Sequence, residues 1–411
     1  MKIVVTTIGT TGDIEPFIAL AQELLSRGHV LTFCSDEFYK NRVEQLGIEF
    51  RAASAFINEA EIRRIGAAVT RQTSPLRQFE VLRDFHLQNL PSHYGACVDV
   101  MADSDVIVCH AIHTVAQAAA ADLGKPWIRV VLDPSLTPTS SYPPPPLPNL
   151  GAGLNRLLWS LAERSLRALD KPLHDMLLQA GSRQSAMRMF RTPSPLLNLL
   201  ACSDAVTGPL NDLPQNFRFT GFWSRDDDNS RLSDGLSAFL EANPKPLLVS
   251  LGSMAGVARE KIQAVFDQAL PALDVPVVIQ QGAAAYSAAA SGERGLGVGF
   301  EPHHLLFPLA GCVIHHGGAG TTAAACRAGV PSVVIPHFGD QHYWANRLYR
   351  KGVAPRPLSP EQISVNSLSR AVKTALSSGR MANQCADLRD LMRAENGIGR
   401  AADMMEHIVR V

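Results

Sequence analysis

The chain has 411 residues, of which 46% are hydrophobic and 18% charged, a composition typical of a well-packed soluble enzyme with about two domains. Lys plus Arg and Asp plus Glu both number 38, so the formal charge is zero and nothing favours a nucleic-acid-binding protein. Seven scattered cysteines without a C-x-x-C pair indicate a reduced, cytoplasmic chain without a metal site. The N-terminal apolar run is too short for a signal peptide, and no uninterrupted run of about 18 apolar residues predicts a membrane span.

The N-terminal half predicts a doubly wound parallel sheet. Residues 2–8 are β-branched and apolar, residues 14–27 have helical periodicity, and residues 30–34 form a second apolar run. This β-loop-α-β order is the first unit of such a sheet. The pattern recurs as a strand, an Ala-rich helix and a strand at 105–109, 113–122 and 127–132.

Three segments between the predicted sheets have a distinct composition. Residues 138–148 include six prolines among eleven residues, which excludes a helix or a central strand and predicts an ordered surface loop. Residues 153–180 have the period of an amphipathic helix. Residues 222–234 are polar and follow neither period, which is typical of an interdomain linker. Its acidic run, Asp226–Asp228, is interpreted as a solvated loop rather than a metal site.

A second α/β series begins beyond the linker, with predicted strands at 247–251, 275–280, 313–315 and 332–335. Two such halves predict two doubly wound, Rossmann-like domains that face a cleft, with ligands at the carboxyl ends of the strands. We expect an N-terminal domain at 1–220, a linker at 221–234 and a C-terminal domain at 235–390.

The segment Gly311–Thr322 reads GCVIHHGGAGTT, with a predicted strand before it and an Ala-rich helix after it. Glycines let backbone amides approach a ligand, and a helix N-terminus adds unpaired N–H groups and partial positive charge, so the segment predicts an anion site. His316 adds a donor, or a full charge if protonated, and the threonines add hydroxyls. A tight strand-to-helix turn without a ligand is the structural alternative.

The same glycines also fit a second motif. Gly318–Ala323 matches G-x-G-x-x-A, with Asp340 about 20 residues further on, which is the dinucleotide fingerprint of NAD(P)-dependent oxidoreductases. That fingerprint usually occupies the first βα turn of a domain, whereas here it lies late in the second half. Asp340 and Gln341 follow the next predicted strand, and a carboxylate beside an amide suits sugar hydroxyls. Capping of the following helix by Asp340 is the alternative.

The residues HHGGAGTTAAACRAGVPSVVIPHFGDQHYWANRL, from His315 onward, resemble the donor-binding signature of UDP-sugar-dependent glycosyltransferases of the GT-B fold. The similarity is greatest to the sterol glucosyltransferase-like branch. In that branch a PHxxLFP segment precedes HHGGxGTT, and RAGxP and PFFGDQ follow it. The corresponding segments here are Pro302–Pro308 and Pro336–Gln341.

The N-terminus carries the same resemblance independently. Gly9–Leu20 is similar to the GxxGDxxPFxAL opening of that branch, residues 27–29 to its RGH segment, and residues 134–143 to its proline- and threonine-rich acceptor loop. The resemblance implies that Asp13 is the general base of an inverting displacement that needs no metal. From its position alone, Asp13 would cap a helix that starts at Ile14.

Further site residues follow from the resemblance. The diphosphate would be held by Ser253, His316, Gly318, Gly320 and Thr321. The base would be bordered by Phe300, Pro302 and His303, and the transferred sugar would be bound by Asp340 and Gln341. The acceptor pocket would include Phe17, Pro134, Thr137 and Tyr142. His110 and His113 are added to it because they lie just past the carboxyl end of a predicted strand. A C-terminal helix at about 391–411 would return to the first domain.

The resemblance therefore implies a hexosyltransferase that moves glucose from UDP-glucose, with a dTDP-sugar as the other donor, to a lipophilic acceptor such as a sterol, triterpenoid or polyketide. No cofactor is expected beyond the nucleotide sugar. We expect a monomer or weak homodimer that is compatible with peripheral membrane contact. Two alternatives stay open: an NAD(P)-dependent oxidoreductase that uses Gly318–Ala323, and a non-catalytic nucleotide-sugar binder.

Overall fold

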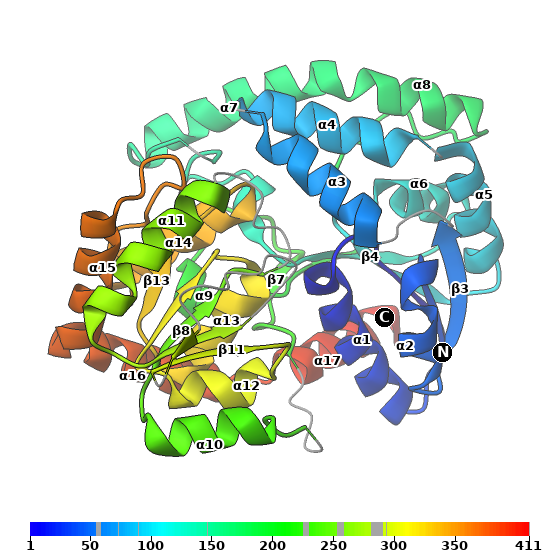
Figure 1. Cartoon of the computed structure of the whole chain (residues 1–411). Helices are drawn as coiled ribbons and strands as arrows, with labels where there is room; N and C mark the ends of the chain where they lie inside the picture. Colours follow the sequence, from blue (N-terminus) through cyan, green and yellow to red (C-terminus); the bar gives the residue numbers. More distant parts are fainter. Residues whose placement is uncertain are drawn as a thin grey trace. The chain divides into compact units, whose positions relative to one another are not determined.

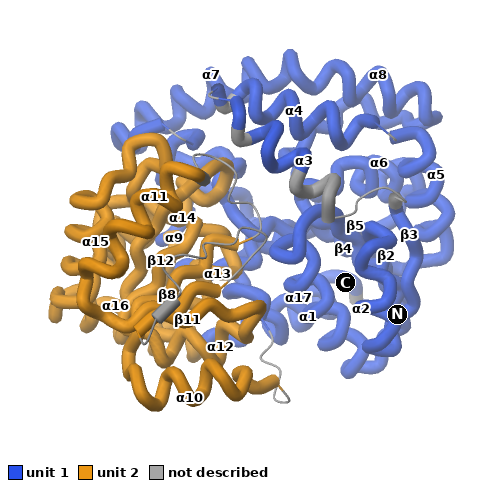
Figure 2. Tube along the Cα trace, in the orientation of Figure 1, with its two compact units in different colours: residues 1–204, 208–225, 395–411 blue, residues 205–207, 226–394 orange. Residues whose placement is uncertain are grey.

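A computed structural model of the chain divides into two compact units (Figures 1 and 2). Unit 1 comprises residues 1–204, 208–225 and 395–411, and unit 2 comprises residues 205–207 and 226–394. The structure describes residues 1–54, 59–72, 74–88, 90–145, 147–224, 230–252, 259–280, 291–292 and 294–410. Each unit is built around its own mainly parallel β-sheet, so the predicted α/β class with two doubly wound sheets is confirmed.

Within its described residues, unit 1 has a seven-stranded sheet in the order β3-β2-β1-β4-β5-β6-β7, and all neighbouring strands are parallel. The strands are β1 Lys2–Thr6, β2 Val30–Asp36, β3 Glu49–Ser54, β4 Val106–His110, β5 Trp127–Val131, β6 Leu197–Leu200 and β7 Phe217–Phe219. The winding reverses on either side of β1, so the edge beyond the carboxyl ends of β1 and β4 is where such a sheet binds ligands.

Helices cover both faces of this sheet. Ile3 and Val5 of β1 pack in one hydrophobic layer with α1 and α17, whereas Val4 packs in a second layer with α5, α6 and α8. Side chains alternate along a strand, so β1 contributes to both layers. The helices of this unit are α1 Thr11–Ser26, α2 Lys40–Glu44, α3 Glu59–Thr70, α4 Pro75–Leu87, α5 Leu90–Met101, α6 Thr114–Asp122, α7 Ala152–Leu169, α8 Lys171–Gln179 and α17 Gly397–Arg410, with α9 Asp204–Thr207 at the unit boundary.

The amphipathic segment predicted at 153–180 forms two helices rather than one. α7 ends at Leu169 and α8 begins at Lys171, with Asp170 between them and Pro172 in the first turn of α8. Proline has no N–H to donate and its ring crowds the preceding turn, so it fits a helix start and not a helix interior. The prediction of one continuous helix was therefore wrong at this proline.

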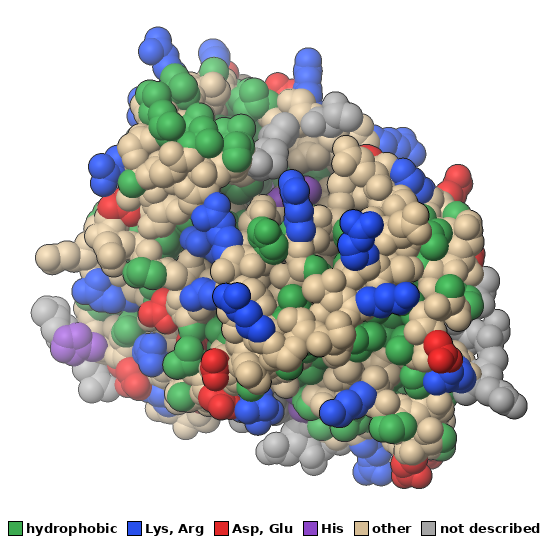
Figure 3. All heavy atoms as spheres, turned by 90° about the vertical axis from the view of Figure 1, so that its left-hand side faces the viewer, with side chains coloured by type: hydrophobic (Ala, Val, Ile, Leu, Met, Phe, Trp, Pro, Cys, Tyr) green, Lys and Arg blue, Asp and Glu red, His purple; other side chains and the backbone are tan. Residues whose placement is uncertain are grey.

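One exposed stripe of α7 is apolar. Asn155 and Trp159 are buried, whereas Leu154, Leu157 and Leu161 are 50%, 54% and 55% exposed and share one face of the helix. Figure 3 shows that hydrophobic side chains gather at the upper left of one face of the molecule, with Lys and Arg nearby. No helix in the described part of the chain is long and apolar enough to cross a bilayer. The expected peripheral membrane contact stays a prediction.

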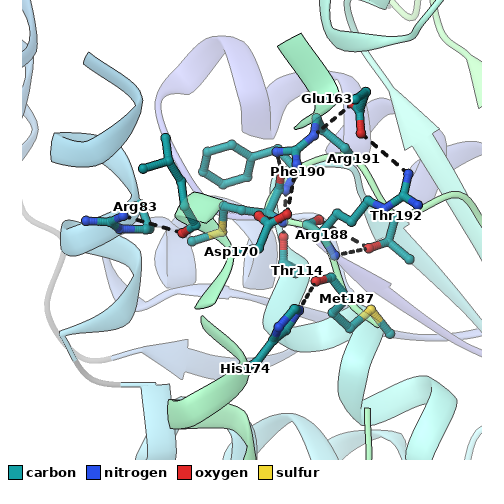
Figure 4. A network of polar contacts seen from close by, with 12 residues as sticks. Arg83, Thr114, Glu163, Asp170, His174, Met187, Arg188, Phe190, Arg191 and Thr192 are labelled. Carbon is teal, nitrogen blue, oxygen red and sulfur yellow. Dashed lines mark hydrogen bonds and ion pairs between the residues drawn. The ribbon is translucent and has the colours of Figure 1, made fainter. Parts of the chain in front are cut away.

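A buried ion-pair network holds the end of α7 to the loop before β6 (Figure 4). Arg191 and Asp170 are paired at 2.9 Å with side chains 1% and 2% exposed, and Arg191 contacts Glu163 at 3.1 Å. The N–H of Met189 donates to the second Asp170 oxygen, and Arg191 donates to the Met189 carbonyl. Each buried charge therefore has several partners, as burial of a charge requires.

The described residues of unit 2 form a six-stranded sheet in the order β10-β11-β9-β8-β12-β13, parallel except between β10 and β11. Its strands are β8 Leu247–Ser250, β9 Val277–Gln280, β10 Ser291–Gly292, β11 Gly295–Val298, β12 Cys312–His315 and β13 Ser332–Val334. Its helices are α10 Asp234–Ala242, α11 Arg259–Ala269, α12 His303–Leu306, α13 Ala319–Ala328, α14 Asp340–Lys351, α15 Val365–Ser377 and α16 Gly379–Arg393. Leu248, Val278 and Val313, from three neighbouring strands, form its core with α12 and α13.

Candidate functional site

The candidate donor site lies at the carboxyl ends of the parallel strands of unit 2. β8 ends at Ser250, β9 at Gln280 and β12 at His315, and the residues after β13 lead into α14. The carboxyl ends of neighbouring parallel strands meet at one edge of the sheet. Four segments that are far apart in the sequence therefore come together at this edge.

Gly317 and Gly318 make the turn between β12 and α13. Gly317 has φ +88°, and a Cβ atom on it would lie 2.8 Å from Val334 and 3.0 Å from the carbonyl oxygen of Gln341. Gly318 is the N-cap of α13, and a Cβ atom there would lie 2.4 Å from Nε2 of His316. Residue 317 must be glycine because its φ is positive and because Val334 and Gln341 leave no room for a Cβ atom. Residue 318 must be glycine because the imidazole of His316 occupies the space that a Cβ atom would take.

The imidazole of His316 lies against two glycines. A Cβ atom on Gly252, two residues after β8, would lie 3.0 Å from Cε1 of this ring, and one on Gly318 would lie 2.4 Å from its Nε2. Burial lowers the pKa of His316 to about 4, and the backbone of Ser250 acts in the opposite sense. The ring is therefore uncharged near neutral pH, so of its two predicted roles the neutral hydrogen-bonding one fits the structure.

The N-terminus of α13 is open. Among the described residues no side chain caps this helix at Gly318. Gly320, in the first turn, is exposed, and a Cβ atom on it would meet no described atom within 4 Å. Thr321 follows it and is 9% exposed. The N–H groups of a first helical turn have no partners inside the helix, so this end is suited to an anion.

Several buried polar atoms near this turn have no hydrogen-bond partner within the described ranges: Nε2 of His315, Oγ1 of Thr322 and both ring nitrogens of His337. Nδ1 of His315 accepts from the N–H of Gly317 at 3.1 Å, so its Nε2 carries the proton and is a buried donor. A buried polar group left unpaired costs about 1–3 kcal/mol. Unpaired buried polar groups are rare in proteins, so their presence marks this turn as a candidate site.

His337 is a site residue that the sequence analysis did not single out. It is 6% exposed, and its pKa is lowered to about 4, first by burial and then by His316. The signal was present in the sequence, because the sterol-type pattern reads PFFGDQ where this chain has His337 in PHFGDQ. An imidazole in place of a phenyl ring adds one donor and one acceptor to the wall of the site.

The pair Asp340 and Gln341 begins α14. Oε1 of Gln341 accepts from the N–H of His337 at 2.8 Å and of Phe338 at 3.4 Å, so it orders the loop before the helix. Gly339, with φ +58°, is the N-cap, and Asp340 is the first helical residue. The alternative in which Asp340 is the cap was therefore wrong by one position.

Polar and aromatic groups continue along the same edge. His303 stacks on Phe307 with ring centroids 4.3 Å apart, and its Nε2 lies 3.1 Å from Oε1 of Gln280 and 3.5 Å from Oγ of Ser250. Phe300 is 83% exposed, with its ring centroid 6.3 Å from that of His303. These rings, with Pro302 as the N-cap of α12 between them, suit a planar base. Ser253, Asp226 and Asp228 lie outside the described residues.

Asp13 lies in the first turn of α1 in unit 1. This helix begins at Thr11, with Thr10 as the N-cap, so the predicted start at Ile14 and the predicted N-cap role of Asp13 were wrong by three residues. Oδ2 of Asp13 accepts from the backbone N–H of Thr10 at 2.8 Å and from its hydroxyl at 2.9 Å. Asp13 is the acidic member of a capping box. Burial raises its pKa to about 6 against these two hydrogen bonds.

Asp36, at the end of β2, is a second carboxyl that sequence reasoning missed. Gly9 separates it from Asp13: the Gly9 N–H donates to Oδ2 of Asp36 at 3.2 Å, and a Cβ atom on Gly9 would lie 2.6 Å from Oδ2 of Asp13. Oδ1 of Asp36 is buried without a partner in the described part of the chain. Burial raises the pKa of Asp36 to about 7, and Asp13 adds to this. The sequence signal that could have identified Asp36 is its position at the carboxyl end of a strand.

Comparisons with known proteins agree over both units. Residues 3–104 match the glycosyltransferase family 28 N-terminal domain, and residues 263–405 match the C-terminal domain of erythromycin biosynthesis protein CIII-like proteins. O-mycaminosyltylonolide 6-deoxyallosyltransferase of Streptomyces fradiae is 30% identical over 99% of this chain and 97% of its own length. The chain belongs to the glycosyltransferases.

Two further comparisons extend this result. Sterol 3-beta-glucosyltransferase of Komagataella phaffii is 26% identical to this glycosyltransferase over 97% of the chain, which corresponds to 34% of that longer protein. The structure of spinosyn rhamnosyltransferase SpnG complexed with thymidine diphosphate has a TM-score of 0.70 at 17% identity, covering 99% of this chain and all of that one. The predicted GT-B fold is confirmed, and membership of this family excludes the oxidoreductase alternative.

The predicted acceptor residues of the glycosyltransferase belong to the interior of unit 1. Phe17 and His110 are 0% and 3% exposed, with ring centroids 4.9 Å apart. Nδ1 of His110 is 3.0 Å from the hydroxyl of Thr7, and His113, also fully buried, has Nδ1 2.8 Å from the hydroxyl of Thr6. Burial lowers the pKa of His110 to about 3, so it is uncharged. Their role in acceptor binding stays a prediction.

The proline-rich loop is ordered by its own hydrogen bonds. Pro134 begins a short 3₁₀ turn, and its carbonyl accepts from the hydroxyl of Tyr142, while Nε1 of Trp159 donates to the Tyr142 carbonyl at 2.8 Å. Thr137 and Tyr142 are 4% and 5% exposed. Apart from Pro146, which the structure does not describe, residues 138–148 contain neither helix nor strand, as predicted.

Proposed function

We propose that this glycosyltransferase moves a hexose from a nucleoside diphosphate to a hydroxyl of a lipophilic small molecule. The observation that carries the proposal is the open N-terminus of α13, where helix amides, the uncharged His316 and the buried donors of His315 and His337 gather. Such groups bind a diphosphate through hydrogen bonds and the helix dipole. Asp340 and Gln341 begin the neighbouring helix, where they would bind the hydroxyls of the sugar.

UDP-glucose is the donor that we propose. The sterol glucosyltransferase relative supports glucose by its name, whereas the relative from Streptomyces fradiae is named for a 6-deoxyallosyl group. The solved rhamnosyltransferase binds thymidine diphosphate, so a dTDP-sugar is the competing donor. Phe300 and His303 would border either base, because uracil and thymine differ by one methyl group.

The proposed mechanism is a direct displacement with inversion. The acceptor oxygen attacks the anomeric carbon while the bond to the diphosphate breaks, and the nucleoside diphosphate leaves with the electron pair. Asp13 takes the acceptor proton, since a carboxyl with its pKa raised to about 6 is mostly ionised at neutral pH yet more basic than an ordinary aspartate. A base in this position contributes about 10²–10⁴-fold. The α13 amides stabilise the leaving charge, at a few kcal/mol for each donor.

The acceptor class rests on the named relatives, which act on O-mycaminosyltylonolide and on a sterol. We propose a sterol, triterpenoid or polyketide-type acceptor with one accessible hydroxyl. The predicted acceptor residues Phe17, Pro134 and Tyr142 are apolar or aromatic, which favours a lipophilic compound over a sugar or peptide. A mass-spectrometric screen with UDP- and dTDP-hexoses against a mixed acceptor library tests donor and acceptor together.

Two substitutions test the assigned residues. Asp13→Asn is expected to leave UDP affinity unchanged and to lower kcat by at least about 100-fold, since the acceptor proton then has no base.

His316→Ala is expected to raise the Kd of UDP by about 10-fold through loss of a donor. Asp103→Asn, at a 91% exposed carboxylate, and His407→Ala, at an exposed imidazole, are the matched controls.

Near-normal turnover of the Asp13 variant would remove the base assignment, and an unchanged Kd for the His316 variant would remove the diphosphate assignment. Calorimetry of UDP and TDP binding, together with turnover assays, separates these results. Donor binding by the wild-type protein without turnover of any acceptor in the library would favour a non-catalytic nucleotide-sugar binder instead.

A further inference from the structure

A cluster of imidazoles and thiols lies in the interior of unit 1. His93, Cys97 and His113 each place one potential ligand atom within 4.8 Å of the others. Nε2 of His113 lies 2.7 Å from Nε2 of His93 and 4.0 Å from Sγ of Cys97. The three residues are 7%, 0% and 0% exposed. Neutral imidazole nitrogen and thiolate sulfur are the donors that Zn²⁺ takes in proteins.

The secondary structure brings these donors together. His93 and Cys97 are four residues apart on α5, so they share one face of that helix. His113 is the N-cap of α6, which packs against α5. Nδ1 of His113 is 2.8 Å from the hydroxyl of Thr6. A hydrogen bond to the far nitrogen is the usual way in which a metal-binding histidine is oriented.

Two further thiols lie beside this cluster. Thr6 on β1 is in register with Cys34 on β2 and with Cys109 on β4, so the three side chains lie on the same face of the sheet. Cys34, Cys109 and Cys97 of α5 pack in one buried layer.

We propose that unit 1 binds one Zn²⁺ ion through His93, Cys97 and His113. Tetrahedral zinc with ordinary bond lengths places two nitrogen ligands about 3.3 Å apart and a nitrogen and a sulfur about 3.6 Å apart. The observed separations are 2.7 Å and 4.0 Å. Shifts of about 0.6 Å and 0.4 Å convert one arrangement into the other, and side-chain rotation supplies them.

The protons of this binding step balance. The thiol of Cys97 releases a proton, and its thiolate offsets part of the charge of the ion in an apolar interior. The contact between His93 and His113 requires that one Nε2 carries a hydrogen, so that ring transfers its proton to Nδ1 when both Nε2 atoms bind the ion. No oxidant or reductant is involved.

The ion would stabilise the fold rather than take part in sugar transfer. Its ligands join α5 to the start of α6, and Thr6 joins His113 to β1. Metal bound to the folded chain but not to the unfolded chain adds its binding free energy to stability. Loss of the metal is therefore expected to lower the Tm of unit 1 without changing the Kd of UDP.

Cobalt substitution tests this site directly. The full-length protein, treated with a chelator and dialysed, is titrated with Co²⁺ and then with Zn²⁺. We expect one ion for each chain, visible d–d bands of tetrahedral Co²⁺ and an ultraviolet thiolate-to-cobalt charge-transfer band, all displaced by Zn²⁺. Cys97→Ser and His93→Gln are expected to weaken binding at least 100-fold, about 2.7 kcal/mol. Cys326→Ser, at a buried cysteine of unit 2, is the matched control.

A wild-type protein that shows no charge-transfer band, or that binds Co²⁺ equally well after Cys97→Ser, would overturn the proposal, because the ion would then sit on surface histidines. Circular dichroism of each variant shows whether it folds. If neither variant folds, the wild-type protein still decides the question, since Zn²⁺ must raise its Tm and must protect Cys97 from alkylation. Absence of both effects overturns the site.

Discussion

Two buried polar regions of this glycosyltransferase differ in whether their polar groups are paired. Around Arg191 in unit 1, the guanidinium contacts Asp170, Glu163 and a backbone carbonyl, and each group has a protein partner (Figure 4). Around the β12–α13 turn in unit 2, the described residues leave His315, Thr322 and His337 with buried polar atoms that have no partner. Both regions are buried, but only the first is complete within the described protein.

The difference distinguishes buried polar groups that stabilise the fold from buried polar groups that bind a ligand. A buried charge network without a ligand must satisfy itself, because each unpaired charge costs several kcal/mol. A binding site instead keeps donors unpaired until the ligand arrives, and it tolerates the cost of about 1–3 kcal/mol for each neutral group. Pairing therefore predicts opposite results for substitutions in the two regions: loss of stability in the first, and loss of affinity with unchanged or improved stability in the second.

The largest expected effect is on the paired region. Arg191→Met is expected to lower the free energy of unfolding of unit 1 by about 3–5 kcal/mol, because Asp170 stays buried without its cation. Urea unfolding followed by circular dichroism measures the change. Arg188→Met, at a side chain 42% exposed whose contact with Glu163 is 3.5 Å, is the control and should cost less than about 1 kcal/mol. Equal losses of free energy of unfolding in the two variants would contradict the distinction between a paired buried charge and a surface charge.

The second effect concerns Asp36, a carboxyl in unit 1 whose Oδ1 has no partner among the described residues. Its pKa is raised from 3.8 to about 7, so the folded protein keeps a proton that the unfolded chain has lost, and stability declines as pH rises from about 4 to 7. Asp36→Asn removes this dependence. The free energy of unfolding of the variant, relative to that of wild type, should rise by about 2 kcal/mol from pH of about 5.5 to pH of about 8. Urea unfolding at each of these two pH values measures the change. A constant difference would show that Asp36 ionises normally.

The sequence predicted what depends on local pattern. The β-branched runs at 2–8, 105–109 and 127–132 correspond to β1, β4 and β5 with ends shifted by one or two residues, and the alternation of strands and helices gave the fold class. β6 and β7 were not predicted, because the runs Leu197–Leu200 and Phe217–Phe219 are only four and three residues long and their pairing is set by distant strands. The helix at 153–180 was overextended, because the periodicity continues through Pro172.

The candidate site was predictable where its residues are consecutive. His316, Gly318 and Gly320 lie in one motif, whose glycine turn and helix start exist as expected. The approach of Asp36 to Gly9, and of His113 to His93 and Cys97, could not be read from spacing, because separate elements bring these residues together. The expectation of a chain without a metal site rested on the missing C-x-x-C pair, and the proposed zinc site needs no such pair.

His337 tests the unpaired region. His337→Phe replaces a ring whose nitrogens have no partner within the described chain by an apolar ring of similar size, as in the PFFGDQ pattern. Stability is expected to stay constant or to rise by about 1 kcal/mol, while the Kd of UDP-glucose rises about 10-fold through loss of a hydrogen bond. Thermal unfolding and calorimetry measure the two quantities. A destabilised variant with unchanged affinity would place His337 among the structural groups.

Gly320→Ala is expected to have a smaller effect, again with higher stability and weaker ligand binding. A Cβ atom here meets no described atom within 4 Å, and alanine favours the helix, so stability should rise by about 0.5–1 kcal/mol. The same methyl group would stand at the open helix end, where it should weaken diphosphate binding by about 3- to 10-fold. Gly379→Ala, at another helix start with no atom within 4 Å, is the control for stability alone. Tighter UDP binding by the Gly320 variant would show that the ligand does not approach this turn.

The smallest expected effect is the absence of a pH response in donor binding. The pKa of His316 is lowered from 6.5 to about 4 by burial, so the ring stays uncharged as the pH falls from about 8 to 5.5. The Kd of UDP-glucose should therefore be constant across this range, whereas an imidazolium that paired with the diphosphate would strengthen binding as the pH fell through its pKa.

UDP-glucose is the proper probe, since the terminal phosphate of UDP itself titrates near pH of about 6. Calorimetry uses the Asp13→Asn variant, because the carboxyl with a pKa of about 6 then no longer titrates in this pH range. Wild-type kcat, in contrast, should fall as the pH drops below about 6, because protonated Asp13 cannot accept the acceptor proton. Affinity that rises at low pH would show that charge, and not an unpaired neutral donor, defines this site.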